Sequence, residues 1–133
     1  MKWKFAISTI VMFVMSLGLG MLVHGVLLKG DYAQYPNLMR PLAEVQSKFP
    51  VTALAHLCIA LAFSWVYLKG REEKSWLSQG VRYAIAVALL SAVPAYLIYY
   101  AVVPVPFLFA LKPMIYDTAR LILMGIVLAW VNR

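Results

Sequence analysis

The chain has 133 residues, of which 64% are hydrophobic, and it carries a formal net charge of +7 and one cysteine. This composition is typical of an integral membrane protein and excludes an ordinary soluble domain. The lone Cys58 excludes an intramolecular disulfide. The cations cluster at the ends of apolar segments, so we attribute the positive charge to membrane topology and expect no nucleic-acid partner.

Four apolar segments predict membrane-spanning helices, because each is long enough to cross a bilayer. They cover residues 5–28, 51–68, 83–103 and 114–131. The first segment is too long for a signal peptide and lacks a small-residue cleavage pattern, so we expect it to remain as a helix. The predicted fold is one all-α domain over residues 1–133, an integral membrane four-helix bundle.

Two connections carry local predictions. In residues 29–50, Leu42, Val45 and Phe49 recur at helical spacing, which indicates either a short amphipathic helix on the membrane surface or an ordinary loop. In the third span, Pro94 predicts a kink, because proline leaves a carbonyl one turn earlier without its usual partner.

The fourth span carries two charges, Asp117 and Arg120. A charge at the centre of a membrane helix costs roughly 2.5–3.5 kcal/mol on insertion scales, so such charges must lie near an end, pair, or face a polar interior. Their i,i+3 spacing places them on one helical face. The helix has two possible starts, Phe107 or Met114, and the earlier start moves both charges toward its middle.

The distribution of cations predicts that both termini are cytoplasmic. Seven cations then lie on the inner side and four on the outer side. The inner set is Lys2, Lys4, Lys69, Arg71, Lys74, Arg82 and Arg133; the outer set is Lys29, Arg40, Lys48 and Lys112.

Small and polar residues recur at i,i+4 spacing in every span, which predicts the faces that pack together. With this topology, the polar side chains of all four spans collect in the outer half of the bundle, and the inner half is expected to hold glycine, alanine and aliphatic residues. Buried ionisable groups in a membrane are candidate sites. The candidate ligand-binding residues are His24, His56, Tyr96, Tyr100, Tyr116, Asp117 and Arg120.

Two interpretations of this cluster stay open. Asp117 and Arg120 form a structural ion pair, or Arg120 holds a small anionic or quinone-like ligand with Asp117 and the histidines as proton partners. Paired imidazoles from His24 and His56 are also the ligands that a haem would use, although a metal site would need more ligands. We expect no cofactor and no metal.

The sequence favours a non-catalytic accessory or structural subunit that packs against other membrane proteins or itself in the lipid bilayer. No nucleophile–base arrangement identifies an enzyme, and the catalytic residues, if any, are unknown. The alternatives are a binding protein for a small ligand, quinone or haem, and a small oligomeric transporter, which the Pro94 kink and the buried charges support.

Four stretches of the chain resemble a group of small uncharacterised bacterial membrane proteins with four spans. They are residues 24–40, residues 65–100, the Tyr116-Asp117-Thr118 segment and residues 129–133. The resemblance implies a multi-pass protein of the bacterial cytoplasmic (inner) membrane and brings no biochemical role.

Overall fold

The computed structural model describes residues 2–133, which form four long helical rods and no strand. The elements are α1 (Lys2–Leu22), η1 (Val23–Leu27), α2 (Lys29–Ala33), η2 (Pro36–Leu38), α3 (Leu42–Ser47), α4 (Phe49–Gly70), α5 (Trp76–Leu90), α6 (Ala92–Val102) and α7 (Phe107–Val131). Four stretches are long and apolar enough to cross a membrane, Lys2–Leu27, Phe49–Gly70, Trp76–Val102 and Phe107–Val131. The prediction of an all-helical protein with four candidate spans is confirmed.

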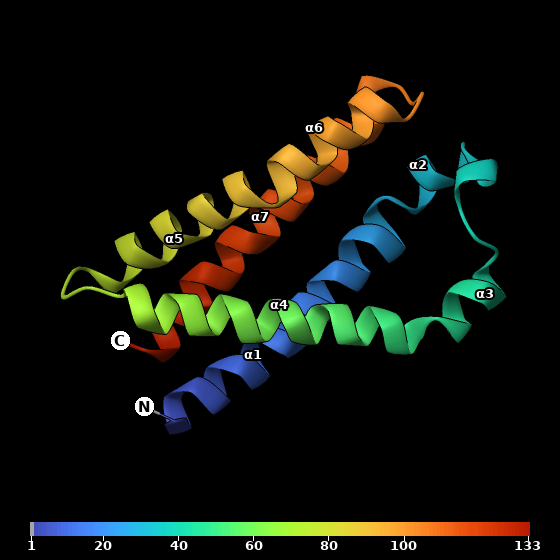
Figure 1. Cartoon of the computed structure of the whole chain (residues 1–133). Helices are drawn as coiled ribbons and strands as arrows, with labels where there is room; N and C mark the ends of the chain where they lie inside the picture. Colours follow the sequence, from blue (N-terminus) through green and yellow to red (C-terminus); the bar gives the residue numbers. More distant parts are fainter. Residues whose placement is uncertain (1) are drawn as a thin grey trace.

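Both termini and the α4–α5 loop lie at one end of the molecule, which we call the terminus end (Figure 1). The opposite end, which we call the distal end, carries α2, α3 and the α6–α7 loop. All four tryptophans lie near the terminus end, at Trp3, Trp65, Trp76 and Trp130. Tryptophan is enriched at the membrane–water interface, so the position of these four side chains at one end fits a bundle that spans a membrane.

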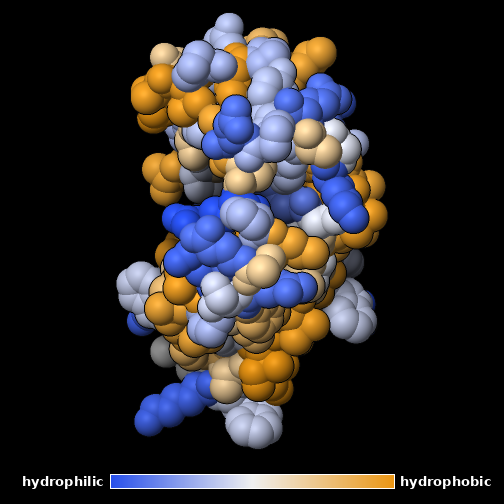
Figure 2. All heavy atoms as spheres, turned by 90° about the vertical axis from the view of Figure 1, so that its right-hand side faces the viewer, coloured by the Kyte–Doolittle hydropathy of each residue, from blue (hydrophilic) through white to orange (hydrophobic). Residues whose placement is uncertain are grey.

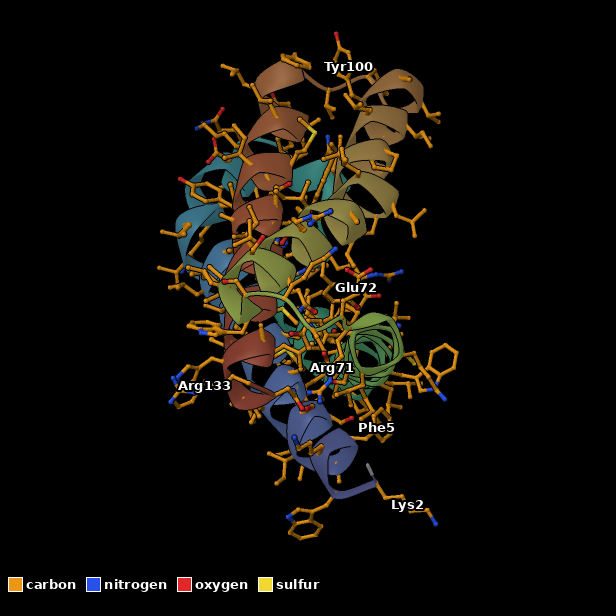
Figure 3. All side chains as sticks on the ribbon, turned by 90° about the vertical axis from the view of Figure 1, so that its left-hand side faces the viewer. Lys2, Phe5, Arg71, Glu72, Tyr100 and Arg133 are labelled. Carbon is orange, nitrogen blue, oxygen red and sulfur yellow. The ribbon has the colours of Figure 1, made fainter. Side chains whose placement is uncertain are left out.

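The four rods are not equally aligned (Figure 1). Three of them, α1, α5–α6 and α7, run in similar directions, whereas α4 crosses α1 at a steep angle and diverges from the others toward the distal end. The view from the terminus end shows α4 almost along its axis while the other rods stand upright (Figure 3). The distal half of the molecule is therefore open on one side.

Hydrophilic side chains gather across the middle of the distal face, with apolar side chains around them (Figure 2). The short helices of this end account for the pattern. Lys112 of α7 forms an ion pair with Asp31 of α2 at 2.7 Å and so fastens α2 against the fourth rod. The six-residue helix α3 coincides with the amphipathic pattern that the sequence shows around Val45.

The structure refines the predicted spans at two points, the start of the fourth helix and the break within the third. The fourth rod begins at Phe107, the earlier of the two predicted starts, so Pro113 lies inside the helix and Asp117 lies well within it. The start at Met114 is therefore wrong: a proline can be tolerated within a membrane helix when neighbouring helices pack around it, and Pro113 is buried. The kink expected from Pro94 occurs at Ser91, where the backbone leaves the helical region between α5 and α6.

The closest helix contact joins α5 to α7 and depends on glycine. A Cβ atom added to Gly80 would lie 2.5 Å from the backbone oxygen of Gly125, and one added to Gly125 would overlap the backbone oxygen of Gly80. Ala84 and Ala129 complete the same contact. The small-residue stripes predicted for these two spans thus face each other, since only small side chains allow two backbones to approach so closely.

We predict that Gly80→Ala or Gly125→Ala lowers the stability of the fold. A backbone oxygen cannot move aside as a flexible side chain can, so α5 and α7 must separate, at a cost of about 1–3 kcal/mol. Unfolding in mixed detergent micelles, followed by circular dichroism, measures the change. Gly18→Ala is the matched control, because nothing lies within 4 Å of the new Cβ. Equal stability of all three variants would contradict the contact.

Candidate ligand-binding site

Asp117, on α7, is the residue around which polar side chains gather. Its Oδ2 atom lies 3.2 Å from His24 Nε2 and accepts a 2.5 Å hydrogen bond from the Tyr96 hydroxyl. Its Oδ1 atom lies 3.3 Å from Arg120 Nε. Asp117 is only 5% exposed. The structure therefore surrounds a buried carboxylate with donors from η1, α6 and its own helix, as burial of a charge requires.

Tyr32, on α2, extends this network and is not among the site residues predicted from the sequence. Its hydroxyl lies 2.5 Å from His24 Nδ1, and the two rings are parallel to within 1°. His24 Nε2 must donate to the ionised Asp117, so in the neutral imidazole Nδ1 accepts a hydrogen bond from the Tyr32 hydroxyl. Burial, together with the charge of Asp117, raises the pKa of Tyr32 to about 12, so the hydroxyl keeps its proton at neutral pH.

The local backbone explains why helical spacing did not reveal Tyr32. On a continuous α-helix, residues eight apart are separated by about 12 Å along the axis. Here a π-helical turn, η1, contains His24, and Leu28 N–H bonds to Val23 O at 2.9 Å. The chain then turns at Leu28 into α2. Single π-helical turns are often found at functional sites, because they redirect side chains out of the regular register.

Arg120 pairs with Asp117 by charge and without a well-formed hydrogen bond. Its side chain is 12% exposed, and its buried Nε atom has no hydrogen-bond partner although Asp117 Oδ1 is within ion-pair distance. A guanidinium cannot lose its charge, so Asp117 is the group that balances it inside the bundle.

His56, on α4, approaches the same place from the other side of α1. Its Nδ1 atom lies 2.7 Å from Ser16 Oγ, whereas its Nε2 atom has no hydrogen-bond partner in the described part of the chain. A Cβ atom added to Gly20 would lie 3.2 Å from His56 Nε2 and 2.9 Å from one terminal nitrogen of Arg120. The side chains of Arg120 and His56 therefore pack directly against the bare backbone of Gly20, where even a methyl group would require one of them to move.

A groove of about 830 Å³ opens beside this contact, between α1 with η1 and α3 with α4. No Asp, Glu, Lys or Arg side chain lines it. Its wall is mostly apolar, with His24 and His56 as its ionisable side chains; it consists of Gly20, Met21, His24, Gly25, Leu42, Val45, Gln46, Phe49, Thr52 and His56. An apolar cavity with a few convergent polar groups is the usual form of a small-molecule site.

Two of the predicted site residues lie outside this cluster. Tyr100 is 41% exposed, packs its ring on Phe107, and points away from the rods at the far tip of α6 (Figure 3). Tyr116 is 38% exposed. Both Tyr96 and Tyr100 lie on α6, and Tyr100 is one turn closer to the end of that helix, next to the α6–α7 loop.

The expectation that the inner half contains only small and aliphatic residues is also incomplete. At the terminus end, the Asn132 side-chain amide donates to Ser8 Oγ at 2.9 Å and to Leu128 O at 2.8 Å. Arg71 donates to Asn132 O at 2.8 Å. These contacts join the start of α1, the end of α4 and the end of α7, and so close the end of the bundle opposite the groove.

The two histidines do not suit a haem or a metal ion. Both ring nitrogens of His24 already have partners, Tyr32 and Asp117, so coordination by His24 would break one of these bonds. Within residues 2–133, no group of three or more His, Cys, Asp or Glu side chains could hold a metal ion. The cluster instead suits hydrogen bonding and charge recognition.

Comparison of the chain with protein-family models, with curated proteins and with solved structures gives no match.

We predict that Asp117 and Arg120 are energetically coupled. Asp117→Asn leaves a buried guanidinium without its counter-charge, and Arg120→Gln leaves a buried carboxylate, each at a cost of about 3 kcal/mol. The double variant removes both charges and should be less destabilised than either single variant. Unfolding free energies of the four proteins in one detergent give the coupling energy. Additive losses would contradict the pairing.

Proposed function

We propose that this protein binds a small amphipathic ligand that enters from the lipid phase. The observation that carries the proposal is the 830 Å³ groove, whose mostly apolar walls include the imidazoles of His24 and His56. An amphipathic molecule would place its chain along the walls and its polar end at these imidazoles. This is the ligand-binding alternative of the sequence analysis, and its supporting residues are His24, His56, Tyr96, Asp117 and Arg120.

The walls of the groove support access from lipid. Leu42 is 72% exposed, Phe49 is 47% exposed, and Val45 is 49% exposed. These side chains belong to α3 and the start of α4, the part of the molecule that diverges from the other rods (Figure 1). Acyl chains solvate such residues well, so a lipid-like molecule could reach the groove from the side without crossing a polar barrier.

The location follows from the distribution of charge and from the resemblance noted above. We propose a bacterial cytoplasmic membrane with the terminus end inside, since that end carries more of the cations. The groove then lies in the outer leaflet half. The buried network of Asp117 is the framework that holds the floor of this groove in place.

We predict that Gly25→Leu reduces ligand binding without unfolding the protein. Gly25 lines the groove, and nothing lies within 4 Å of a Cβ added there, so a leucine would occupy free volume. The assay uses the full chain in nanodiscs of phosphatidylcholine and diazirine-bearing tetradecyl probes with carboxylate or hydroxyl heads. Labelled peptides, mapped by mass spectrometry, should come from α1, α3 and α4 and fall by roughly tenfold in the variant, the factor expected for about 1.4 kcal/mol of lost affinity.

Gly18→Leu is the matched control, because Gly18 lies on α1, has equally open surroundings and does not line the groove. Labelling of these peptides should be unchanged in the control. If neither probe labels the groove, or if both leucine variants behave like the unmodified protein, the groove is not a binding site and the proposed function is wrong.

A role as an accessory subunit is the second candidate. α6 packs on α7, yet none of its residues is buried, and its exposed side chains include Leu97, Ile98 and Val102. Such a surface suits a partner helix as well as lipid. We expect the protein extracted from native membranes in a mild copolymer to migrate as a larger species in native electrophoresis. A single species of monomer size would contradict this role.

A further inference from the structure

We infer that a crevice between the end of α4 and the start of α5 binds the head group of an anionic phospholipid. The crevice has a volume of about 330 Å³ and lies at the α4–α5 loop, where Figure 3 shows Arg71 and Glu72. The four tryptophans mark this end of the molecule as an interfacial one, which is the depth of lipid phosphates. The crevice is distinct from the groove, and the inference does not depend on the proposed function.

The crevice carries an excess of positive charge. Three cations line it, Arg71, Lys74 and Arg82, against one acid, Glu72. Glu72 forms an ion pair with Lys74, whereas Arg71 and Arg82 form no ion pair within residues 2–133. Two guanidiniums therefore remain without a carboxylate. A head group with a net negative charge would balance them, as in the basic pockets by which membrane proteins bind anionic lipids.

The two arginines differ in how firmly the fold holds them. Arg71 donates from Nη1 to Asn132 O at 2.8 Å, so the end of α7 fixes its guanidinium and leaves its other N–H groups available. Arg82 is exposed and makes no side-chain hydrogen bond in the part of the chain that the structure describes. The planar fork of arginine suits phosphate oxygens, to which it donates two parallel hydrogen bonds. The crevice thus offers one fixed and one adjustable phosphate contact.

The floor of the crevice favours a lipid over a soluble phosphate. Tyr67 and Tyr83 form it, and the Tyr83 hydroxyl is already used, since it donates to Phe63 O at 2.6 Å. Val66 also lines the crevice, one turn deeper along α4 than Gly70, and is 46% exposed. The crevice therefore extends from the charged loop to apolar surface, where acyl chains can continue from a phosphodiester. A soluble phosphate would use only its charged part.

The test compares phosphatidylglycerol and phosphatidylcholine probes that carry the same diazirine-bearing acyl chains. The full chain is labelled in nanodiscs of unlabelled phosphatidylcholine, at the same low mole fraction of each probe, and the peptides are mapped by mass spectrometry. We expect peptides from the end of α4 and the start of α5 to be labelled roughly tenfold more strongly by the phosphatidylglycerol probe. Soluble glycerophosphoglycerol, which is the head group alone, should not compete.

Arg82→Gln should reduce this preference by roughly fivefold, the factor that corresponds to about 1 kcal/mol for one cation near a membrane surface. Arg82→Lys should keep part of it, because lysine retains the charge and loses the planar fork. Both variants should fold, since Arg82 is exposed and forms no ion pair within residues 2–133. Arg40→Gln is the control: it removes the same charge from an exposed arginine that does not line the crevice, and it should keep the full preference.

Four results would overturn the inference. They are equal labelling by the two lipids, a preference that survives Arg82→Gln, an equal loss in Arg40→Gln, which would indicate net charge and not a site, and competition by glycerophosphoglycerol, which would indicate a soluble phosphate ligand. None of these results affects the groove. Failure of the Gly25→Leu experiment, in turn, would leave the crevice between α4 and α5 untouched.

Discussion

The structure depends on one constraint, the burial of the Asp117 carboxylate within a membrane helix. A charge in this position is tolerated only when donors surround it. The fold supplies them from three rods, through His24, Tyr96 and Arg120. The distal ends of α1, α6 and α7 are therefore held together by polar contacts, and α4 is absent from this set. It packs on α1 instead, where His56 Nδ1 lies 2.7 Å from Ser16 Oγ.

Backbone contact and polar contacts both hold the bundle together. Near the terminus end, Gly80 and Gly125 bring the backbones of α5 and α7 into direct contact, where dispersion forces act. Asn132 and Arg71 add polar contacts at the same end, and the Asp117 network joins the rods farther along. The groove is lined by α1, η1, α3 and α4, so its walls take no part in the Gly80–Gly125 contact.

Much of this arrangement could be predicted from the sequence, and the remainder has physical reasons. Hydrophobic length predicted four spans, and i,i+4 spacing predicted that Gly80, Gly125 and Asp117 face inward. Helical periodicity assumes an unbroken helix, so it failed where the backbone departs from one, at the π-helical turn that places His24 beside Tyr32. Periodicity also gives no helix end, and Tyr100 lies close to the end of α6, where it packs on Phe107. The groove is a property of the crossing angle of α4, which no local pattern encodes.

The Asp117 cluster and the groove meet at His24. Its Nε2 atom lies 3.2 Å from Asp117 and its Nδ1 atom lies 2.5 Å from the Tyr32 hydroxyl, and the same side chain lines the groove. A buried donor or acceptor without a partner costs free energy, so these contacts fix the position of the imidazole. Ser16 holds the second imidazole of the groove, His56, through Nδ1. The proposed ligand binding depends on this arrangement, in which two imidazoles held in place by the bundle lie in an otherwise largely apolar wall.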